Sequence, residues 1–90
     1  MKGKSFIIKA NGRIQYIEPA NGSFFSLEEL KKAIGGGWIE VVFLTPDRRM
    51  VVDEEGKLKG MPVNVVASRM YNANDSIVGD ALVCHRNQIK

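Results

Sequence analysis

The sequence predicts an α+β fold, a two-layer sandwich with an antiparallel or mixed sheet and both helices on one face. Two observations support this prediction. Five short segments, some alternating and some continuously apolar, predict strands, and apolar residues recur with the helical period in two others. The segments follow one another in the order ββα-ββαβ, and mixed strands and helices of this kind are typical of an α+β sandwich.

The chain opens with a predicted hairpin. Residues 6–8 form a strand, and Asn11-Gly12 predicts a type I′ turn, which needs positive φ at both central residues. The return strand spans residues 13–18, and its alternation places Ile14 and Tyr16 on one face.

The first helix has a start signal and a stop signal. Ser26 and Glu29 form a capping box, and Phe24-Phe25 just before it predicts a hydrophobic staple. An apolar stripe for the core consists of Leu27, Leu30 and Ile34. Gly35 then ends the helix in a left-handed cap.

The next strand, residues 38–44, has two unlike faces. We expect Ile39, Val41 and Phe43 to face the core. The opposite face is mixed, and we expect it to be half covered; it carries Trp38, Glu40, Val42 and Leu44. A turn at residues 45–48 leads into an antiparallel return strand over residues 49–52.

The second helix opens at Pro62 or Asn64, and an N-cap role explains Asn64 fully. The helical spacing predicts a core stripe made of Val63, Val66, Ala67 and Met70. A turn over residues 72–75 ends the helix, residues 81–85 form the last strand, and residues 86–90 are a polar tail.

Size and composition indicate one domain spanning residues 1–90. The net charge of +3 is mild and the basic residues are dispersed, which permits nucleic-acid binding without arguing for it. Cys84 is the single cysteine, so no intramolecular disulfide can form. No apolar stretch reaches the length of a signal peptide or membrane span, so we expect a cytoplasmic protein without a membrane partner.

Several candidate chemistries fail on geometry or composition. The glycines at 35–37 follow a helix and precede a strand, the reverse of a phosphate-binding loop, and predict a helix stop. Cys84 and His85 are adjacent on a strand and point to opposite faces, so they cannot form a nucleophile–base pair. We expect Cys84 in the core and His85 at the surface. One histidine and one cysteine do not make an ordinary zinc site.

Asp53, Glu54 and Glu55 are the sharpest acidic cluster in the chain. They lack the alternating ligands and distal glutamate of a calcium loop. A solvated turn is the favoured interpretation, and acid–base chemistry is the alternative. We therefore predict that the protein is not an enzyme and has no catalytic residues, no metal and no cofactor.

Four segments resemble, in order, the landmarks of a family of small uncharacterised proteins with a domain-of-unknown-function label. They are Gly36 to Val42 (GGWIEVV), Asp53 to Leu58 (DEEGKL), Gly60 to Asn64 (GMPVN) and Asp75 to Val83 (DSIVGDALV). The resemblance covers about residues 27–84, and the family often shows Tyr where this chain has Trp38. It implies an origin in phages, plasmids or Firmicutes or Bacteroidetes genomes, and no established activity or site.

The sequence favours a non-enzymatic accessory or interaction module with an unknown protein partner. A nucleic-acid-binding domain is the alternative, because Arg48–Arg49 lie at a hairpin tip in a mildly basic chain. A homodimer through the Trp38/Val42/Leu44 face is a further possibility. The candidate interaction residues are Trp38, Arg48, Arg49, Glu54 and Asn64.

Overall fold

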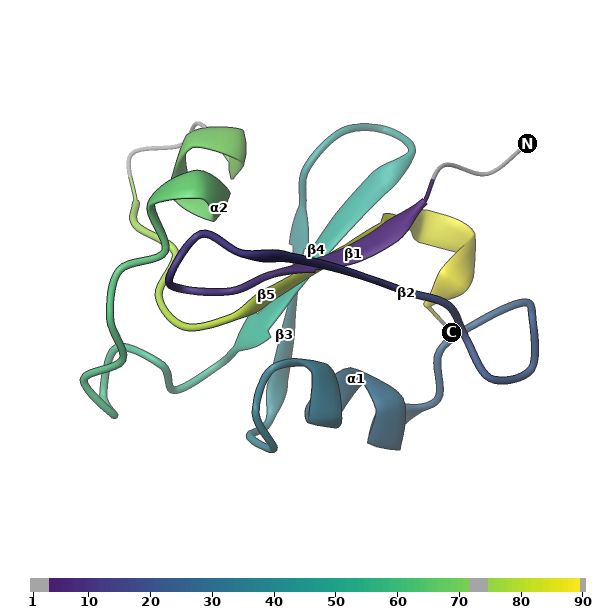
Figure 1. Cartoon of the computed structure of the whole chain (residues 1–90), viewed down its shortest axis with the longest axis horizontal. Coiled ribbons are helices and arrows are strands. Elements are labelled where there is room, and N and C mark those ends of the chain that lie inside the picture. The colour runs from purple at the N-terminus through teal and green to yellow at the C-terminus, as the bar shows by residue number, and fades with distance from the viewer. Residues whose placement is uncertain (1–3, 72–74, 90) are drawn as a thin grey trace.

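The computed structural model describes residues 4–71 and 75–89 and has an α+β fold, as the sequence predicts (Figure 1). Its elements are β1 Ser5–Ile8, β2 Ile14–Ile17, α1 Leu27–Ala33, β3 Ile39–Phe43, β4 Arg48–Asp53, α2 Val65–Tyr71, β5 Ala81–His85 and a 3-10 helix Arg86–Gln88. The predicted turn over residues 72–75 lies largely outside the described residues. None of the described helices is long and apolar enough to cross a membrane.

The strands form one five-stranded sheet in the order β2-β1-β5-β4-β3. Every pairing in it is antiparallel. The last strand in the sequence, β5, lies at the centre, and its residues Ala81 to Cys84 are all buried. A strand that is apolar on both faces needs cover on both faces, which determines where the helices pack.

The two helices cover opposite faces of the sheet, so the prediction of a two-layer sandwich with both helices on one face is wrong. The face under α1, the α1 side, contributes Ile7, Val51, Leu82 and Cys84 to a core shared with Leu30 and Ala33. The other face, the α2 side, contributes Ile8, Met50, Ala81 and Val83 to a core shared with Ala67. In Figure 1 α1 lies below the sheet and α2 above it. The buried runs of β4 and β5 require this layout.

The helix α1 forms largely as predicted. The capping box is complete: the Ser26 hydroxyl accepts a hydrogen bond from the Glu29 amide, and the Glu29 carboxylate accepts one from the Ser26 amide. Gly35 has a φ of 98°, and the Gly36 amide donates to the Lys31 carbonyl at 2.7 Å, which closes a Schellman motif. Phe25 joins Leu30 in the core, as a staple requires. Leu27, however, is 51% exposed, and Ala33 is buried in its place.

The predicted core stripe of the second helix is wrong except for Ala67. Ala67 is fully buried, whereas Val66 and Met70 lie on the exposed side of α2. Val63 precedes the helix and forms an isolated β-bridge with Val78. The helix is short and touches the sheet chiefly through Ala67, with Tyr71 packed at the edge of the core.

The first hairpin has a three-residue loop rather than the predicted two-residue type I′ turn. The Lys9 amide donates to the Arg13 carbonyl, so Ala10, Asn11 and Gly12 form the loop. Gly12 has a φ of 92°, as the last position of a three-residue loop requires.

The strand β3 lies at the sheet edge, and its predicted core face is largely exposed. Ile39 is half-buried, but Val41 is 44% and Phe43 60% exposed, so the prediction fails for those two residues. The α1 side is covered over β1, β5 and β4, and the cover stops short of the outer half of β3. The opposite face is half covered as predicted, with Val42 and Leu44 packed against the core on the α2 side.

Candidate interaction surface

The outer edge of β3 carries main-chain groups that no strand within residues 4–71 and 75–89 pairs. Glu54 donates its amide hydrogen to the Trp38 carbonyl, and Leu44 donates to the Arg48 carbonyl. These bonds mark the residues of β3 that face β4, and direction alternates along an antiparallel strand. The N–H and C=O groups of Ile39, Val41 and Phe43 therefore point away from the sheet. β3 is open to pairing along this side.

Three apolar side chains line this edge and are exposed. Trp38 is 61%, Val41 44% and Phe43 60% accessible to solvent. Edge strands of natural sheets are usually protected by lysine, proline, a bulge or a covering element. The segment from Ile39 to Phe43 contains no lysine or proline, and its single charged residue is Glu40.

Two cations stand over the aromatic rings at the ends of this edge. Lys31 Nζ lies 4.5 Å from the centre of the Trp38 ring, and Arg49 Cζ lies 4.8 Å from that of Phe43. Cations prefer ring faces because the aromatic quadrupole is negative there. Among residues 4–71 and 75–89, neither cation belongs to an ion pair. We call the set Trp38, Val41, Phe43, Lys31 and Arg49 the β3 surface.

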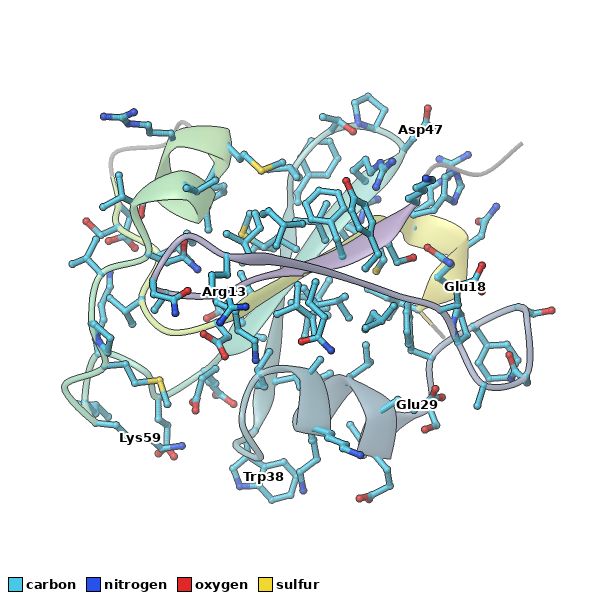
Figure 2. The ribbon with its side chains drawn as sticks, in the orientation of Figure 1. Arg13, Glu18, Glu29, Trp38, Asp47 and Lys59 are labelled. Carbon is cyan, nitrogen blue, oxygen red and sulfur yellow. The ribbon has the colours of Figure 1, made fainter. Side chains whose placement is uncertain are left out.

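Trp38 does not share a face with Val42 and Leu44, contrary to the predicted dimer face. Trp38 precedes the regular part of β3, and its ring lies beside α1, under Lys31. Figure 2 shows Trp38 next to α1 at the lower margin of the molecule. Val42 and Leu44 pack against the core on the α2 side.

Arg48 and Arg49 are neighbours in sequence but lie on opposite faces of the sheet. Arg48 is opposite His85 in the β4–β5 pairing, and its Nη1 donates to the Lys4 carbonyl at 2.8 Å. Arg49 is opposite Cys84, and its Nη1 donates to the Thr45 carbonyl at 2.9 Å. The two guanidinium groups therefore do not form one patch on the hairpin tip.

The acidic cluster also separates. The Asp53 side chain is 2% exposed, accepts from Lys59 Nζ at 2.8 Å and accepts from the Glu55 amide at 2.8 Å. Burial by itself would raise the pKa of Asp53, but the hydrogen bond and charge of Lys59 and the Glu55 amide outweigh burial and lower it. Glu54 and Glu55 are exposed. Asp53 is thus a structural anion rather than part of a triad of carboxylates.

Glu54 lines a shallow hollow of about 170 Å³ on the α2 side. Glu40, Lys57 and Asp75 also line it, and Lys57 and Asp75 form an ion pair with each other. The described residues contain no group of three or more histidine, cysteine or acidic side chains placed to hold a metal ion.

Asn64 is fully buried and bonded at every polar atom of its side chain. Its Nδ2 donates to the Ile8 and Gly79 carbonyls, each at 2.8 Å, and its Oδ1 accepts from the Ala67 amide at 3.1 Å. The last bond caps α2, as the sequence predicts. Asn64 belongs to the scaffold and is not accessible at the surface.

Gly37 has a role that the sequence interpretation missed. A Cβ at Gly37 would overlap the Asp53 carboxylate and lie 2.8 Å from Lys59 Nζ. The third glycine after α1 therefore leaves room for the ion pair between the buried Asp53 carboxylate and the exposed Lys59. The three consecutive glycines were the available signal, but only the tertiary contact distinguishes this one from the two that end the helix.

Cys84 and His85 lie as alternation predicts. Cys84 is fully buried, and burial raises its pKa to about 11 even though Arg48 and Arg49 act to lower it. His85 faces the other way, is half-buried, and its Nδ1 accepts from the Asn87 amide at 3.0 Å.

Gln88 in the tail is buried as well, and its side chain accepts from the Ser5 hydroxyl at 2.8 Å. The sequence predicts only a polar tail here, because the contact of Gln88 joins residues 83 positions apart.

A comparison with known families accounts for nearly the whole chain. No curated protein and no solved structure matches it. The model of one family, described as a domain of unknown function (DUF3846), matches residues 2–89. The chain therefore belongs to the DUF3846 family of domains of unknown function.

Proposed function

We propose that this domain is a non-enzymatic interaction module that binds a protein partner along the outer edge of β3. The observation that carries the proposal is the unpaired, apolar edge of this strand, with Val41 at its centre. Extended segments commonly add to such an edge, since main-chain hydrogen bonds supply affinity and alternate side chains supply specificity.

The other edge strand, β2, provides a comparison within the same molecule. Its Ile14 is 45% exposed, almost the same as Val41. β2, however, has four residues whereas β3 has five, and the Tyr16 ring packs in a T-shaped arrangement with the Phe6 ring, 5.9 Å between their centres. The proposal therefore assigns binding to β3 and makes β2 the internal control.

Photo-crosslinking in the native host tests the proposal. A photoreactive amino acid replaces Val41 in one variant and Ile14 in another, and the crosslinked products are compared. We expect a reproducible partner from position 41 that is absent from position 14. No reproducible product at position 41, or the same products at both positions, would contradict the proposal.

A nucleic-acid-binding domain is the second candidate. Basic residues gather at one end of the sheet, where Arg48 contacts the Lys4 main chain and lies opposite His85, and Arg86 follows directly. Binding driven by phosphate contacts weakens steeply as salt is added. A mobility shift of DNA or RNA at low salt that Arg48→Glu abolishes would support this candidate, and no shift at low salt would remove it.

The proposed setting is bacterial or mobile-element, in the cytoplasm. The resemblance of the segments GGWIEVV, DEEGKL, GMPVN and DSIVGDALV to proteins of phages, plasmids and bacteria supports the origin. A single buried cysteine suits a reducing compartment.

A further inference from the structure

We propose that the partner of the β3 surface is an extended acidic segment that pairs with β3 as a sixth strand. This inference rests on the proposed function and specifies the chemistry of the partner. The segment carries apolar side chains against Val41 and Phe43, and carboxylates that meet Lys31 and Arg49.

The main chain of β3 selects an extended partner. Outward N–H and C=O groups recur at every second residue, Ile39, Val41 and Phe43, and only another strand matches this spacing. The partner's side chains then alternate between the two faces of the sheet. Those on the α1 side meet Val41 and Phe43, which are exposed there and lack cover from α1.

The charges around this edge select an acidic partner. Lys31 lies over Trp38 at one end, and Arg49 lies over Phe43 at the other, so two cations bracket the apolar stripe. Neither pairs with a carboxylate within the described residues. Asp53, on the same side of the sheet, is already bonded to Lys59. A partner that brings its own carboxylates complements this field, whereas a basic one is repelled.

The same charges disfavour a second copy of this chain. Antiparallel pairing of two β3 strands about a two-fold axis at Val41 places Phe43 opposite Ile39 of the second copy. Because Trp38 and its Lys31 adjoin Ile39, this pairing moves Arg49 of one copy toward Lys31 of the other. Like charges brought together at an interface cost binding free energy. A homodimer is therefore an alternative outcome of the test.

Selection from a displayed library of short random peptides, with the full chain as target, tests the inference. We expect enriched sequences to alternate apolar, β-branched residues with polar ones and to contain aspartate or glutamate. An enriched peptide is then synthesised, and its affinity is measured for the wild type and for matched variants. Circular dichroism of each variant checks that the sheet is intact.

Two pairs of variants separate the edge from the charges. Val41→Pro removes an outward N–H and leaves the hydrogen bonds between β3 and β4 in place. It should weaken binding at least about tenfold, because the partner loses one hydrogen bond and the strand geometry that it pairs with. Ile14→Pro makes the same change on β2 and should leave affinity unchanged. Val41→Gln, with Ile14→Gln as its control, replaces this pair if proline unfolds the sheet.

The charge test compares substitutions at Lys31 and Arg49 with a control at Lys32. Lys32 is an exposed lysine on the same helix, and it lies over none of the aromatic rings in the described part of the chain. Lys31→Glu and Arg49→Glu should each weaken binding roughly two- to fivefold, the range of an exposed ion pair, and added salt should weaken it as well. Lys32→Glu should change affinity little. Selection against the Lys31→Glu, Arg49→Glu double variant should enrich basic sequences instead.

The outcomes distinguish this inference from the proposed function. Peptides that need Val41 but show no acidic preference and no response to charge reversal would overturn the acidic partner and leave the edge function standing. Peptides whose binding ignores the Val41 variants would overturn both. A dimer in light scattering that Val41→Pro dissociates would show that the occupant is a second copy.

Discussion

Asn64 joins three parts of the chain through one side chain. Its amide group donates to the main chain of β1 and of the segment before β5, while its oxygen caps α2. A buried polar group is tolerated only when it is bonded, and in turn it satisfies main-chain groups that would otherwise be orphaned. The helix cap was visible in the sequence, but the two carbonyl contacts depend on residues 56 and 15 positions away.

Asn64→Ala should lower the free energy of unfolding by about 3 kcal/mol, since three buried hydrogen bonds are lost at about 1 kcal/mol each. Denaturant titration measures the change. Asn11→Ala is the matched control, because the Asn11 side chain accepts an exposed hydrogen bond from the Arg13 amide, and the substitution should lower stability by about 1 kcal/mol or less. Equal losses in the two variants would show that the buried network contributes nothing.

Asp53 makes folding stability depend on pH. Its pKa in the folded protein lies below the ordinary value of 3.8, so the folded state binds fewer protons than the unfolded one. The stabilisation is therefore complete above the unfolded pKa and is lost as the pH falls through it toward the lower, folded value.

Asp53→Asn should be less stable than the wild type at neutral pH and lose less stability on acidification. The two stabilities should converge between about pH 5 and pH 2, where the wild-type carboxyl takes up its proton. Urea titrations at a series of pH values measure this. The acid dependence of stability that remains in Asp53→Asn comes from Glu29 and Asp75, whose pKa values are also lowered. The Ser26 and Ala20 amides lower the pKa of Glu29. Lys57 and the Ser76 amide lower that of Asp75. Parallel curves for wild type and variant would contradict the role of Asp53.

At the scale of elements, α1 was well predicted because its signals are local. The capping box and the Schellman glycine each involve residues within one or two turns, so the sequence specifies them directly. The sequence does not decide whether Leu27 or Ala33 is buried in the core, because either residue suits an apolar stripe. The position of α1 over β5 determines that Ala33 is buried.

Leu30→Ala and Leu27→Ala compare two leucines in one helix. Leu30 is 3% exposed, so Leu30→Ala should lower the free energy of unfolding by about 2–4 kcal/mol, because it leaves a cavity in the core. Leu27 is 51% exposed, so Leu27→Ala should lower the free energy of unfolding by less than about 1 kcal/mol. Thermal or chemical denaturation measures both. A larger loss at Leu27 than at Leu30 would mean that α1 packs by a different face.

β3 and α2 show where periodicity misleads. The alternation of residues 39–43 correctly divides the strand into two faces, but the exposed face is the more apolar one. The helical spacing of Val63, Val66 and Met70 likewise describes a stripe that contacts little of the sheet. Periodicity reports the direction of side chains, whereas burial depends on what element lies opposite.

At the scale of the whole molecule, the sheet is most protected at its centre. β5 is paired on both sides by β1 and β4, and each of its faces is covered by one core. The edge strands β2 and β3 are paired on one side only. Local opening requires the least disruption at such edges.

Native-state hydrogen exchange should reflect this order. We expect the amides of Leu82 and Val83 to exchange at least about a hundredfold more slowly than the outward amide of Val41, because the central strand opens only with global unfolding. Nuclear magnetic resonance measures the individual rates. Fast exchange throughout β5, with protection concentrated in β2 or β3, would contradict the topology.

The sequence by itself determined the α+β class, the start and end of α1, the asparagine cap of α2 and the inward direction of Cys84. These features follow from contacts between near neighbours or from strict alternation. Only the tertiary structure decided that β5 lies at the centre, that the helices cover opposite faces, that Asn64 and Asp53 are buried, and that Val41 and Phe43 remain exposed at an edge. Strand order and cover depend on which distant segments pack together, and local patterns carry no information about that choice.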